Sequence, residues 1–428
     1  MKARKTTLGA IAVTASLAML TACGGGDTSA SSTAGGNKLE IVSYWTAGSE
    51  VKALNVLTDA MKAADPGIEI VNAAVAGGGG ANARASLATR LAAHKPPSTW
   101  QVIPGFGLQS YVQTGEVADL DDFYKTTGLA DKLPDVVLKA QQFDGKYYSV
   151  PIDVARGNVL WTNPKVLKDA GADLSKASTV SGFLDELAKV KIAGGTPVCL
   201  GDKDGWSPQV LEAFLMAELS GDTYTGLMTG KESFDSPDVK QAVNDFLKYV
   251  SMANTDSPSV TWDQALDNLS KGKCAVNMMG DWAYGQLTSS GAKPSTDFSW
   301  TFLPTANPGG VFDYVGDSFA IAGKNNANPK ASQTWLEQVA DPKVQLDFNK
   351  YKGSVAPRKD VSAETLSQYQ QESAKALSDA TVVLSTSNGL IAPPKFTTAY
   401  MSAVNVLVGT KNVDQFVTAM TQAQKSGL

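Results

Sequence analysis

The fold of this chain is decided by residues 39–71, which read LEIVSYWTAGSEVKALNVLTDAMKAADPGIEIV. Residues 39–45 are rich in β-branched and aromatic side chains and predict a strand. Apolar side chains then recur with the period of a helix, from Val51 to Met61, until an Asp-Pro-Gly sequence ends the pattern. A second strand begins at Ile68. Strand, helix and strand in this order predict a βαβ unit and therefore a largely parallel sheet.

The same alternation continues beyond this unit. Four glycines at 77–80 predict a turn, a helix rich in leucine and alanine follows, and residues 100–103 predict a third strand. Further strands are expected at 274–278 and 318–321, and further helices at 183–190, 236–250, 262–269, 331–339, 397–407 and 413–425. The pattern predicts an α/β fold. Ligands bind beyond the carboxyl ends of the strands in such sheets, so the loops at Trp45, Gly77 and Gln101 should lie near one another.

The length and charge of the chain exclude several classes of protein. The chain has 428 residues, nearly three times the ~150 residues expected of one domain, so we expect two compact lobes. Lys and Arg number 37 against 42 Asp and Glu, and no long basic run occurs. A nucleic acid partner would need a basic stripe and is therefore not expected. His94 is the only histidine, so a His-based metal site is not expected, and neither is a cofactor.

The N-terminus predicts export. Basic residues at 2, 4 and 5 precede an apolar stretch at 7–22 that is too short for a comfortable membrane span. This stretch leads into LTAC at 20–23, which resembles a bacterial lipobox, so residues 1–23 are expected to be a lipoprotein signal peptide with lipidation at Cys23. The alternative is an ordinary secretory signal. Residues 24–38 are expected to form a flexible tether. The protein should therefore be exported and anchored by lipid alone, at the outer face of the membrane or in the periplasm.

Two cysteines, Cys199 and Cys274, remain after this processing. Each lies in a short strand-like run, at 197–200 and at 273–278. A disulfide between them is permitted outside the cytoplasm, and two buried thiols are the alternative. The sequence does not show whether the two runs are neighbours, so both interpretations stay open.

Seven short motifs follow the predicted signal: SYWTAGSE at 43–50, VAGGGG at 75–80, PPSTWQ at 96–101, SVPID at 149–153, MGDW at 279–282, GDSF at 316–319 and KGSVAPR at 352–358. With these motifs in this order, the chain resembles the extracellular solute-binding proteins of bacterial ABC sugar importers. The likeness is greatest to the branch that binds glucose, mannose or similar monosaccharides, and it covers nearly the whole mature chain. The resemblance implies a binding protein rather than an enzyme.

The resemblance also implies a periplasmic-binding-protein fold, also called a Venus flytrap. In this fold two α/β lobes close about a hinge over a ligand in the cleft between them. One lobe would comprise residues 39–148 plus 312–358, and the other residues 149–311 plus 359–428. The implied partners are a monosaccharide of the glucose, mannose or xylose type and the permease subunits of the importer. The protein itself is expected to be a monomer.

Sugar chemistry selects the candidate ligand-binding residues. Aromatic rings cover the face of a sugar ring, and charged or amide groups bind its hydroxyls. Neighbouring strand residues point to opposite faces, so we expect Trp45 to face the ligand ahead of Tyr44, and one of the two to lie in the core. Asp317, at a strand terminus, is expected to accept from two hydroxyls. The other candidates are Glu50, Gly78, Gly79, Gln101, Trp262, Asp281, Lys352 and Asn388.

Some of these candidates have structural alternatives. Glu50 could instead stabilise the first turn of a helix, Trp262 could belong to a helix core, and Asp281 could cap a turn. Lys352 could be a solvated surface charge. Some relatives of the glucose-binding branch place histidines where this chain has Ile103 and Asn388, so the identity of the sugar stays open.

Other functions remain as alternatives. The nearest is a binding protein for a short oligosaccharide. A secreted carbohydrate-active enzyme would need two carboxylates flanking the scissile bond, such as Asp313 with Asp317, or Asp153 with Glu50. A metal-binding surface protein would use the acidic run at 119–122, which lacks the spacing of a calcium loop.

Overall fold

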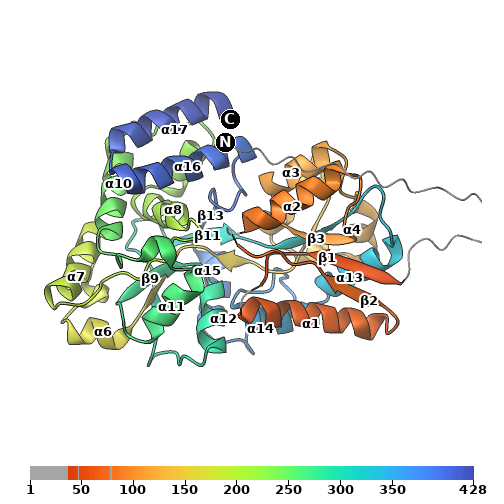
Figure 1. Ribbon diagram of the computed structural model, residues 1–428, viewed down its shortest axis with the longest axis horizontal. Helices are drawn as coiled ribbons and strands as arrows, with labels where there is room; N and C mark the ends of the chain where they lie inside the picture. The colour runs from red at the N-terminus through yellow and green to blue at the C-terminus, as the bar shows by residue number, and fades with distance from the viewer. Residues whose placement is uncertain (1–36, 47, 78–79) are drawn as a thin grey trace, which may run out of the picture. The chain divides into compact units, whose positions relative to one another are not determined.

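Five strands make up the largest sheet. Strands β1 (Lys38–Val42), β2 (Glu69–Asn72) and β3 (Thr99–Val102) run parallel, whereas β12 (Ser318–Ile321) and β6 (Val150–Pro151) run antiparallel to their neighbours, in the order β2-β1-β3-β12-β6 (Figure 1). The structure is a computed structural model, and it describes residues 37–46, 48–77 and 80–428. The predicted parallel strands are confirmed, and two strands from distant parts of the chain complete the sheet.

The two faces of this sheet bury different helices. On one face, Leu39 and Ile41 share a core with α1 (Gly48–Ala64), α13 (Pro329–Ala340) and α14 (Pro342–Lys352). On the other face, Val42 shares a core with α2 (Ala81–Ala92) and α3 (Phe106–Gln113). Figure 1 shows α1 and α14 below the sheet and α2 and α3 above it. The alternation of side chains along β1 decides which helix each strand residue contacts.

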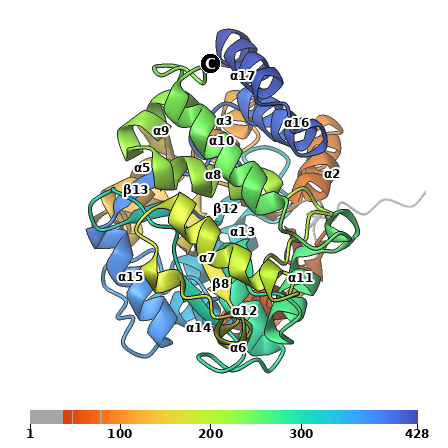
Figure 2. The ribbon, with the colours of Figure 1, turned by 90° about the vertical axis from the view of Figure 1, so that its left-hand side faces the viewer.

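A second group of elements is built around two three-stranded sheets. The first, antiparallel and ordered β10-β8-β9, consists of β8 (Val159–Thr162), β9 (Val276–Met279) and β10 (Ser299–Thr301). The second, ordered β13-β11-β7, consists of β7 (Ala155–Arg156), β11 (Val311–Val315) and β13 (Thr381–Leu384). Helices α7 (Val180–Ile192), α8 (Ser207–Glu218) and α10 (Pro237–Val250) pack together beside the first sheet (Figure 2).

The remaining elements connect or cover these sheets. They are α4 (Asp121–Thr127), α5 (Asp135–Ala140), β4 (Gln142–Phe143), β5 (Lys146–Tyr147), α6 (Pro164–Asp169), α9 (Gly221–Met228), α11 (Trp262–Ser270), α12 (Trp282–Ser289), α15 (Gln368–Asp379), α16 (Pro394–Thr410) and α17 (Val413–Gly427). Helices α16 and α17 pack against each other at the C-terminus (Figure 1). The predicted helices and strands are present with ends shifted by a few residues, except that the strand-like run at 197–200 forms only isolated bridges.

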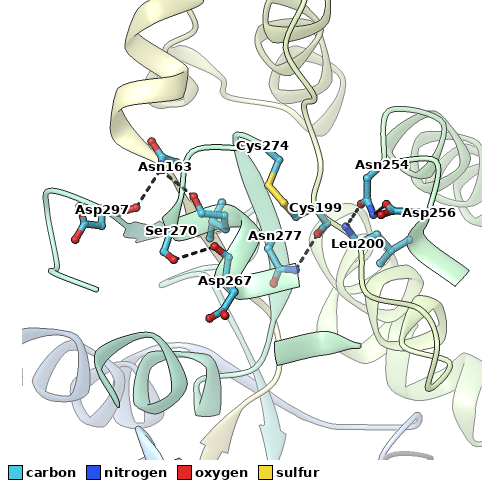
Figure 3. The surroundings of a disulfide bond; sticks show 11 residues. Asn163, Cys199, Leu200, Asn254, Asp256, Asp267, Ser270, Cys274, Asn277 and Asp297 are labelled. Atoms are coloured by element: carbon cyan, nitrogen blue, oxygen red, sulfur yellow. Dashed lines mark hydrogen bonds between the residues drawn. A yellow bond between two sulfur atoms is a disulfide. The ribbon is translucent and has the colours of Figure 1, made fainter. Parts of the chain in front are cut away.

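The structure pairs Cys199 with Cys274 in a disulfide, with their Cα atoms 5.6 Å apart (Figure 3). The backbone N–H of Cys199 donates to the carbonyl of Val276 in β9 at 2.8 Å, and the side chain of Asn277 donates to the carbonyl of Cys199 at 2.8 Å. The run at 197–200 therefore lies beside β9, although it makes only isolated bridges and is not a full strand. The sequence did not show whether the two cysteine-containing runs are neighbours, and the structure places them side by side.

Some predictions lie outside the described residues. They are the signal peptide at 1–23, the lipidation of Cys23, nearly all of the tether at 24–38, and the glycines Gly78 and Gly79. Among the helices of the described ranges, none is long and apolar enough to cross a membrane.

The acidic run at 119–122 organises its own loop. Asp119 pairs with Lys146 and accepts the backbone N–H of Asp121 at 2.9 Å, while Asp121 accepts the backbone N–H of Tyr147 at 2.9 Å. Within the part of the chain that the structure describes, no group of three or more His, Cys, Asp and Glu residues could hold a metal ion.

Candidate ligand-binding site

A cavity of about 430 Å³ lies between the carboxyl ends of β1 and β3 and the first turns of α11 and α12. Its volume falls within the ~300–1,000 Å³ of most small-molecule sites. The loops after β1, β2 and β3 contribute Tyr44, Gly77 and Ile103 to its lining. These loops therefore converge, as the parallel strand order predicted. Of the other described candidates, Glu50, Trp262, Asp317, Lys352 and Asn388 also line the cavity.

One wall of the cavity carries a cluster of paired charges, made of Glu50, Asp317 and Lys352. Nζ of Lys352 donates to Oε1 of Glu50 at 2.8 Å and lies 3.7 Å from Oδ2 of Asp317. The hydroxyl of Tyr44 donates to the other oxygen of Asp317, Oδ1, at 2.6 Å. Three segments far apart in the chain thus meet in one hydrogen-bonding network.

Polar side chains behind this wall hold Asp317 in place. Gln101 donates from Nε2 to Oδ1 of Asp317 at 2.7 Å, and its Oε1 accepts the backbone N–H of Tyr44 at 3.1 Å. The backbone N–H of Asp317 donates to Asp153 at 2.7 Å, and Asp153 also accepts from Ser354 at 3.3 Å. With Oδ1 occupied by two donors, Oδ2 of Asp317 is the oxygen closer to Lys352.

The charges in this wall shift one another's protonation. Burial alone would lower the pKa of Lys352, but the carboxylates of Glu50, Asp317 and Asp153 outweigh it and raise that pKa, so Lys352 stays charged. Burial raises the pKa of Glu50, and the nearby Lys352 opposes the rise. Burial, together with the charge of Asp317, raises the pKa of Tyr44 well above its usual value, so its hydroxyl remains a donor.

A second part of the lining, the aromatic wall, carries tryptophans. Trp206, Trp262 and Trp282 line it, and the rings of Trp206 and Trp282 lie 5.8 Å apart at a tilt of 43°. Trp262 is the first residue of α11, whose N-terminus is fixed by a capping box of Thr261 and Gln264. Nζ of Lys352 lies 5.7 Å from the ring centre of Trp282, so the charged wall and the aromatic wall meet at that point.

Gly80 is required at the rim of the cavity. Its φ of 88° is in the left-handed region, and a Cβ there would lie 2.9 Å from the ring of Tyr44 and 2.8 Å from Nη1 of Arg84. A side chain at this position would therefore push Tyr44 away from Asp317.

The structure corrects the prediction that Trp45 faces the ligand. Trp45 is completely buried, with its ring 5.7 Å from that of Phe319 and 5.1 Å from that of Phe348. Tyr44 lines the cavity instead. One of the two residues does belong to the core, as alternation requires, but β1 ends at Val42, so the strand pattern could not determine which one.

Two further candidates do not line the cavity. Gln101 joins Tyr44 to Asp317: its amide oxygen accepts the backbone N–H of Tyr44, and its amide nitrogen donates to Asp317. Both polar atoms of its side chain are therefore engaged within the protein. Asp281 is fully buried and accepts the backbone N–H of Arg156 in β7 at 3.0 Å, so it holds a strand and not a ligand. Trp282, of the MGDW motif, is mostly buried and also lines the cavity.

Sequence reasoning missed several lining residues, notably Arg84, Lys203, Trp206 and Ser387. Trp206 had a detectable signal, because it immediately precedes Ser-Pro, a typical helix start. Lys203 and Ser387 lie in loops that carry no motif, and Arg84 lies on α2 just after the glycine run, so only the folded chain brings them to the cavity.

A family model for the bacterial extracellular solute-binding proteins matches residues 47–346 of this chain. The chain belongs to this family. This solute-binding protein is similar to an uncharacterized ABC transporter extracellular-binding protein of Pyrococcus horikoshii, with 34% identity over 91% of this chain and 88% of that protein. It is also similar to a xylose/arabinose-binding protein of Haloferax volcanii, with 27% identity over 90% of this chain and 84% of the relative.

The fold of the solute-binding protein is shared by solved structures. A chitin oligosaccharide binding protein aligns with a TM-score of 0.79 over 91% of this chain and 98% of that one. The sequence identity is 19%, so this likeness concerns the fold alone. The predicted two-lobed α/β fold is confirmed.

Proposed function

We propose that this solute-binding protein captures a neutral sugar in the cavity and delivers it to the permease of an ABC importer. The observation that carries the proposal is that one cavity is lined both by a charged wall, with Tyr44, Glu50, Asp317 and Lys352, and by an aromatic wall of three tryptophans. Carboxylates and an ammonium group bind hydroxyls, and indole rings cover the apolar face of a pyranose or furanose ring. Lys352 is already neutralised by two carboxylates, which favours an uncharged ligand.

The lobes that we assign are residues 39–148 plus 312–358 and residues 149–311 plus 359–428. With these boundaries the charged wall belongs to one lobe and the tryptophan wall to the other. A ligand that contacts both walls binds the closed form better than the open form, and this difference in affinity drives closure. Strand β6, at Val150–Pro151, pairs with the sheet of the first lobe, so the first crossing would fall close to residue 151. Strand β11, at Val311–Val315, pairs with β7 and β13 of the other lobe, so the second crossing would fall after residue 315 and not at residue 312.

We infer a monosaccharide as the ligand. The relative from Haloferax volcanii is described as binding xylose and arabinose, which supports this size class. Ile103 and Val315 contribute apolar surface to the lining and offer no side-chain partner to a sugar hydroxyl. A short oligosaccharide is the alternative outcome of the test below.

We infer that the protein acts by binding without catalysis, outside the cytoplasm, anchored through Cys23 and active as a monomer. In support, Glu50 and Asp317, two of the four carboxylates that line the cavity, both pair with Lys352. Asp153 and Asp313 are completely buried. Neither is placed to reach a scissile bond.

A binding panel tests the proposal. Melting temperatures are measured with monosaccharides, disaccharides and amino acids, and positive ligands are taken to calorimetry. At about 100 times its dissociation constant, the cognate sugar should raise the free energy of unfolding by about 2.7 kcal/mol. Trp262→Ala should abolish the shift. Trp300→Ala, a matched control on β10 outside the cavity lining, should keep it.

The same panel can overturn the proposal. No shift with any sugar, or a shift with amino acids alone, would contradict sugar binding. Chromatography of the sugars after incubation should return them unchanged, and release of a cleaved product would contradict a purely binding role. A shift with oligosaccharides only would replace the monosaccharide assignment.

A further inference from the structure

We propose that Glu212, which does not line the cavity, is a positioning residue that holds the loop 385–388 against the ligand. Ser387 and Asn388 of this loop form part of the cavity wall. The inference rests on the proposed function, because it concerns affinity at the same site. It assigns a role to a buried acid on α8 that no motif of the sequence indicated.

The carboxylate of Glu212 is completely buried and is surrounded by donors from the loop. Its Oε1 accepts the backbone N–H of Thr386. Its Oε2 accepts the backbone N–H of Ser387 at 3.0 Å, the hydroxyl of Ser387, and the hydroxyl of Ser385 at 3.2 Å. The hydroxyl of Tyr224 completes the cluster by donating to Oε1. One side chain therefore satisfies two consecutive backbone donors and two hydroxyls of the same loop.

Only a side chain whose two terminal atoms are both hydrogen-bond acceptors can accept all of these hydrogen bonds. A carboxylate offers lone pairs on each oxygen, whereas an amide replaces one acceptor by a donor that would face the N–H of Ser387. Burial raises the pKa of Glu212, and the donors of Ser387, Tyr224 and Thr386 oppose that rise. The loop thus stabilises the charge, and the charge in turn fixes the loop.

The hydrogen bonds of Glu212 also affect a residue that lines the cavity. Asn388 donates from Nδ2 to the hydroxyl of Ser385 at 3.0 Å, so the amide that lines the cavity is fixed by a residue that Glu212 itself binds. Helix α8 also starts directly after Trp206 of the aromatic wall. The same helix therefore carries one ligand-facing ring at its start and fixes the loop that faces the ligand less than two turns further on.

Neighbouring Asp313 provides a matched comparison. It is as deeply buried as Glu212, lies on β11 and is packed against Gly157. Among the described residues its carboxylate oxygens have no hydrogen-bond partner, so it does not hold the loop. Replacing each acid by its amide makes the same chemical change at the same depth, but only the replacement of Glu212 removes an acceptor that the loop uses.

The experiment compares Glu212→Gln with Asp313→Asn in the full exported chain. Amide hydrogen exchange of residues 385–389 is measured without ligand, and the dissociation constant is measured by calorimetry for D-xylose, L-arabinose or D-glucose, whichever the wild type binds most tightly. Glu212→Gln should accelerate exchange in this segment and weaken binding about tenfold. Asp313→Asn should leave both unchanged.

A purely structural role would lower the melting temperature without changing the affinity of the folded protein or the exchange of this loop relative to others. That outcome would overturn the proposal. So would equal losses of affinity in both variants. If Glu212→Gln does not fold, Ser385→Ala, which removes one donor to Glu212 and the acceptor of Asn388, should show the same two effects to a smaller degree. Unchanged exchange and affinity in Ser385→Ala would also refute the proposal.

The exchange measurement needs no sugar. If the wild type binds none of the three probes and no other sugar of the panel, the proposed function fails, while the exchange of residues 385–389 still decides whether Glu212 holds the loop.

Discussion

Nζ of Lys352 lies 2.8 Å from Oε1 of Glu50, although 302 residues separate the two in the chain. Their side chains are only 4% and 12% exposed. Lys352 is the last residue of α14 and Glu50 lies in the first turn of α1, and these two helices pack against each other. The pair thus joins the packing of two helices to the chemistry of the cavity wall.

Replacement of Lys352 should lower the stability of the folded protein. Lys352→Met leaves Glu50, Asp317 and Asp153 without their cation, and we expect a loss of about 3–5 kcal/mol of unfolding free energy. Because burial already raises the pKa of Glu50, the deficit should shrink as the pH falls and that carboxyl is protonated. Urea unfolding at two pH values measures both effects. Lys350→Met on the same helix removes an exposed ion pair and should cost less than about 1 kcal/mol. Equal losses in the two variants would contradict this account.

Trp45 and Trp262 should respond differently to substitution. Trp45→Ala opens a hole between Phe319 and Phe348 and should cost about 3–5 kcal/mol of stability. Trp262→Ala should leave the melting temperature of the ligand-free protein nearly unchanged and remove the response to sugar. Thermal unfolding with and without ligand checks both. A stable Trp45→Ala variant that has lost only its ligand response would restore Trp45 to the binding site.

Glu218, at the end of α8, should make stability depend on pH. Burial, and then the charge of Asp245, raises the pKa of Glu218 to about 7 from 4.5. Its contribution to stability is therefore complete below pH 4.5 and is lost as the pH rises through about 7, because the folded protein must then ionise the buried carboxyl. Glu218→Gln removes this cost and should stabilise the protein by about 1–2 kcal/mol at pH 8. Melting temperatures at pH 4.5 should not differ, and a gain of equal size at both pH values would exclude this mechanism.

The disulfide should contribute measurably to stability. It joins residues 75 apart, and removing a bridge of this kind costs about 2–4 kcal/mol. The double variant Cys199→Ala, Cys274→Ala should melt several degrees lower than the oxidised protein. A reductant should lower the melting temperature of the wild type toward that of the variant and leave the variant unaffected. A reductant effect on both proteins would point to another cause.

The periodic pattern of the sequence predicted the sheet but not the orientation of every side chain. Residues 39–71 predicted β1, α1 and β2, because a period of two or of 3.6 follows from the geometry of each element. Tyr44 and Trp45 lie beyond the end of β1, where no period applies. Their orientation depends on the aromatic core that Trp45 enters and on the hydroxyl that Tyr44 donates to Asp317.

Gln101 shows a second limit. Its position at the end of β3 correctly indicated the cavity region, since strand ends converge in a parallel sheet. Whether it binds a ligand or another residue depended on the distance to Asp317, which lies just before β12, more than two hundred residues later. A polar residue type and a strand end cannot supply that distance.

The sequence alone determined the alternation of strands and helices, the convergence of three loops and the chemical kind of wall that carboxylates, a lysine and tryptophans can form. These follow from local periodicity and residue chemistry. Only the tertiary structure decided that Lys352 meets Glu50, that Cys199 meets Cys274, and that Glu212 fixes the loop of Ser387. Each of these contacts joins segments far apart in the chain, and their distance is set by the packing of whole helices and sheets, which no local pattern records.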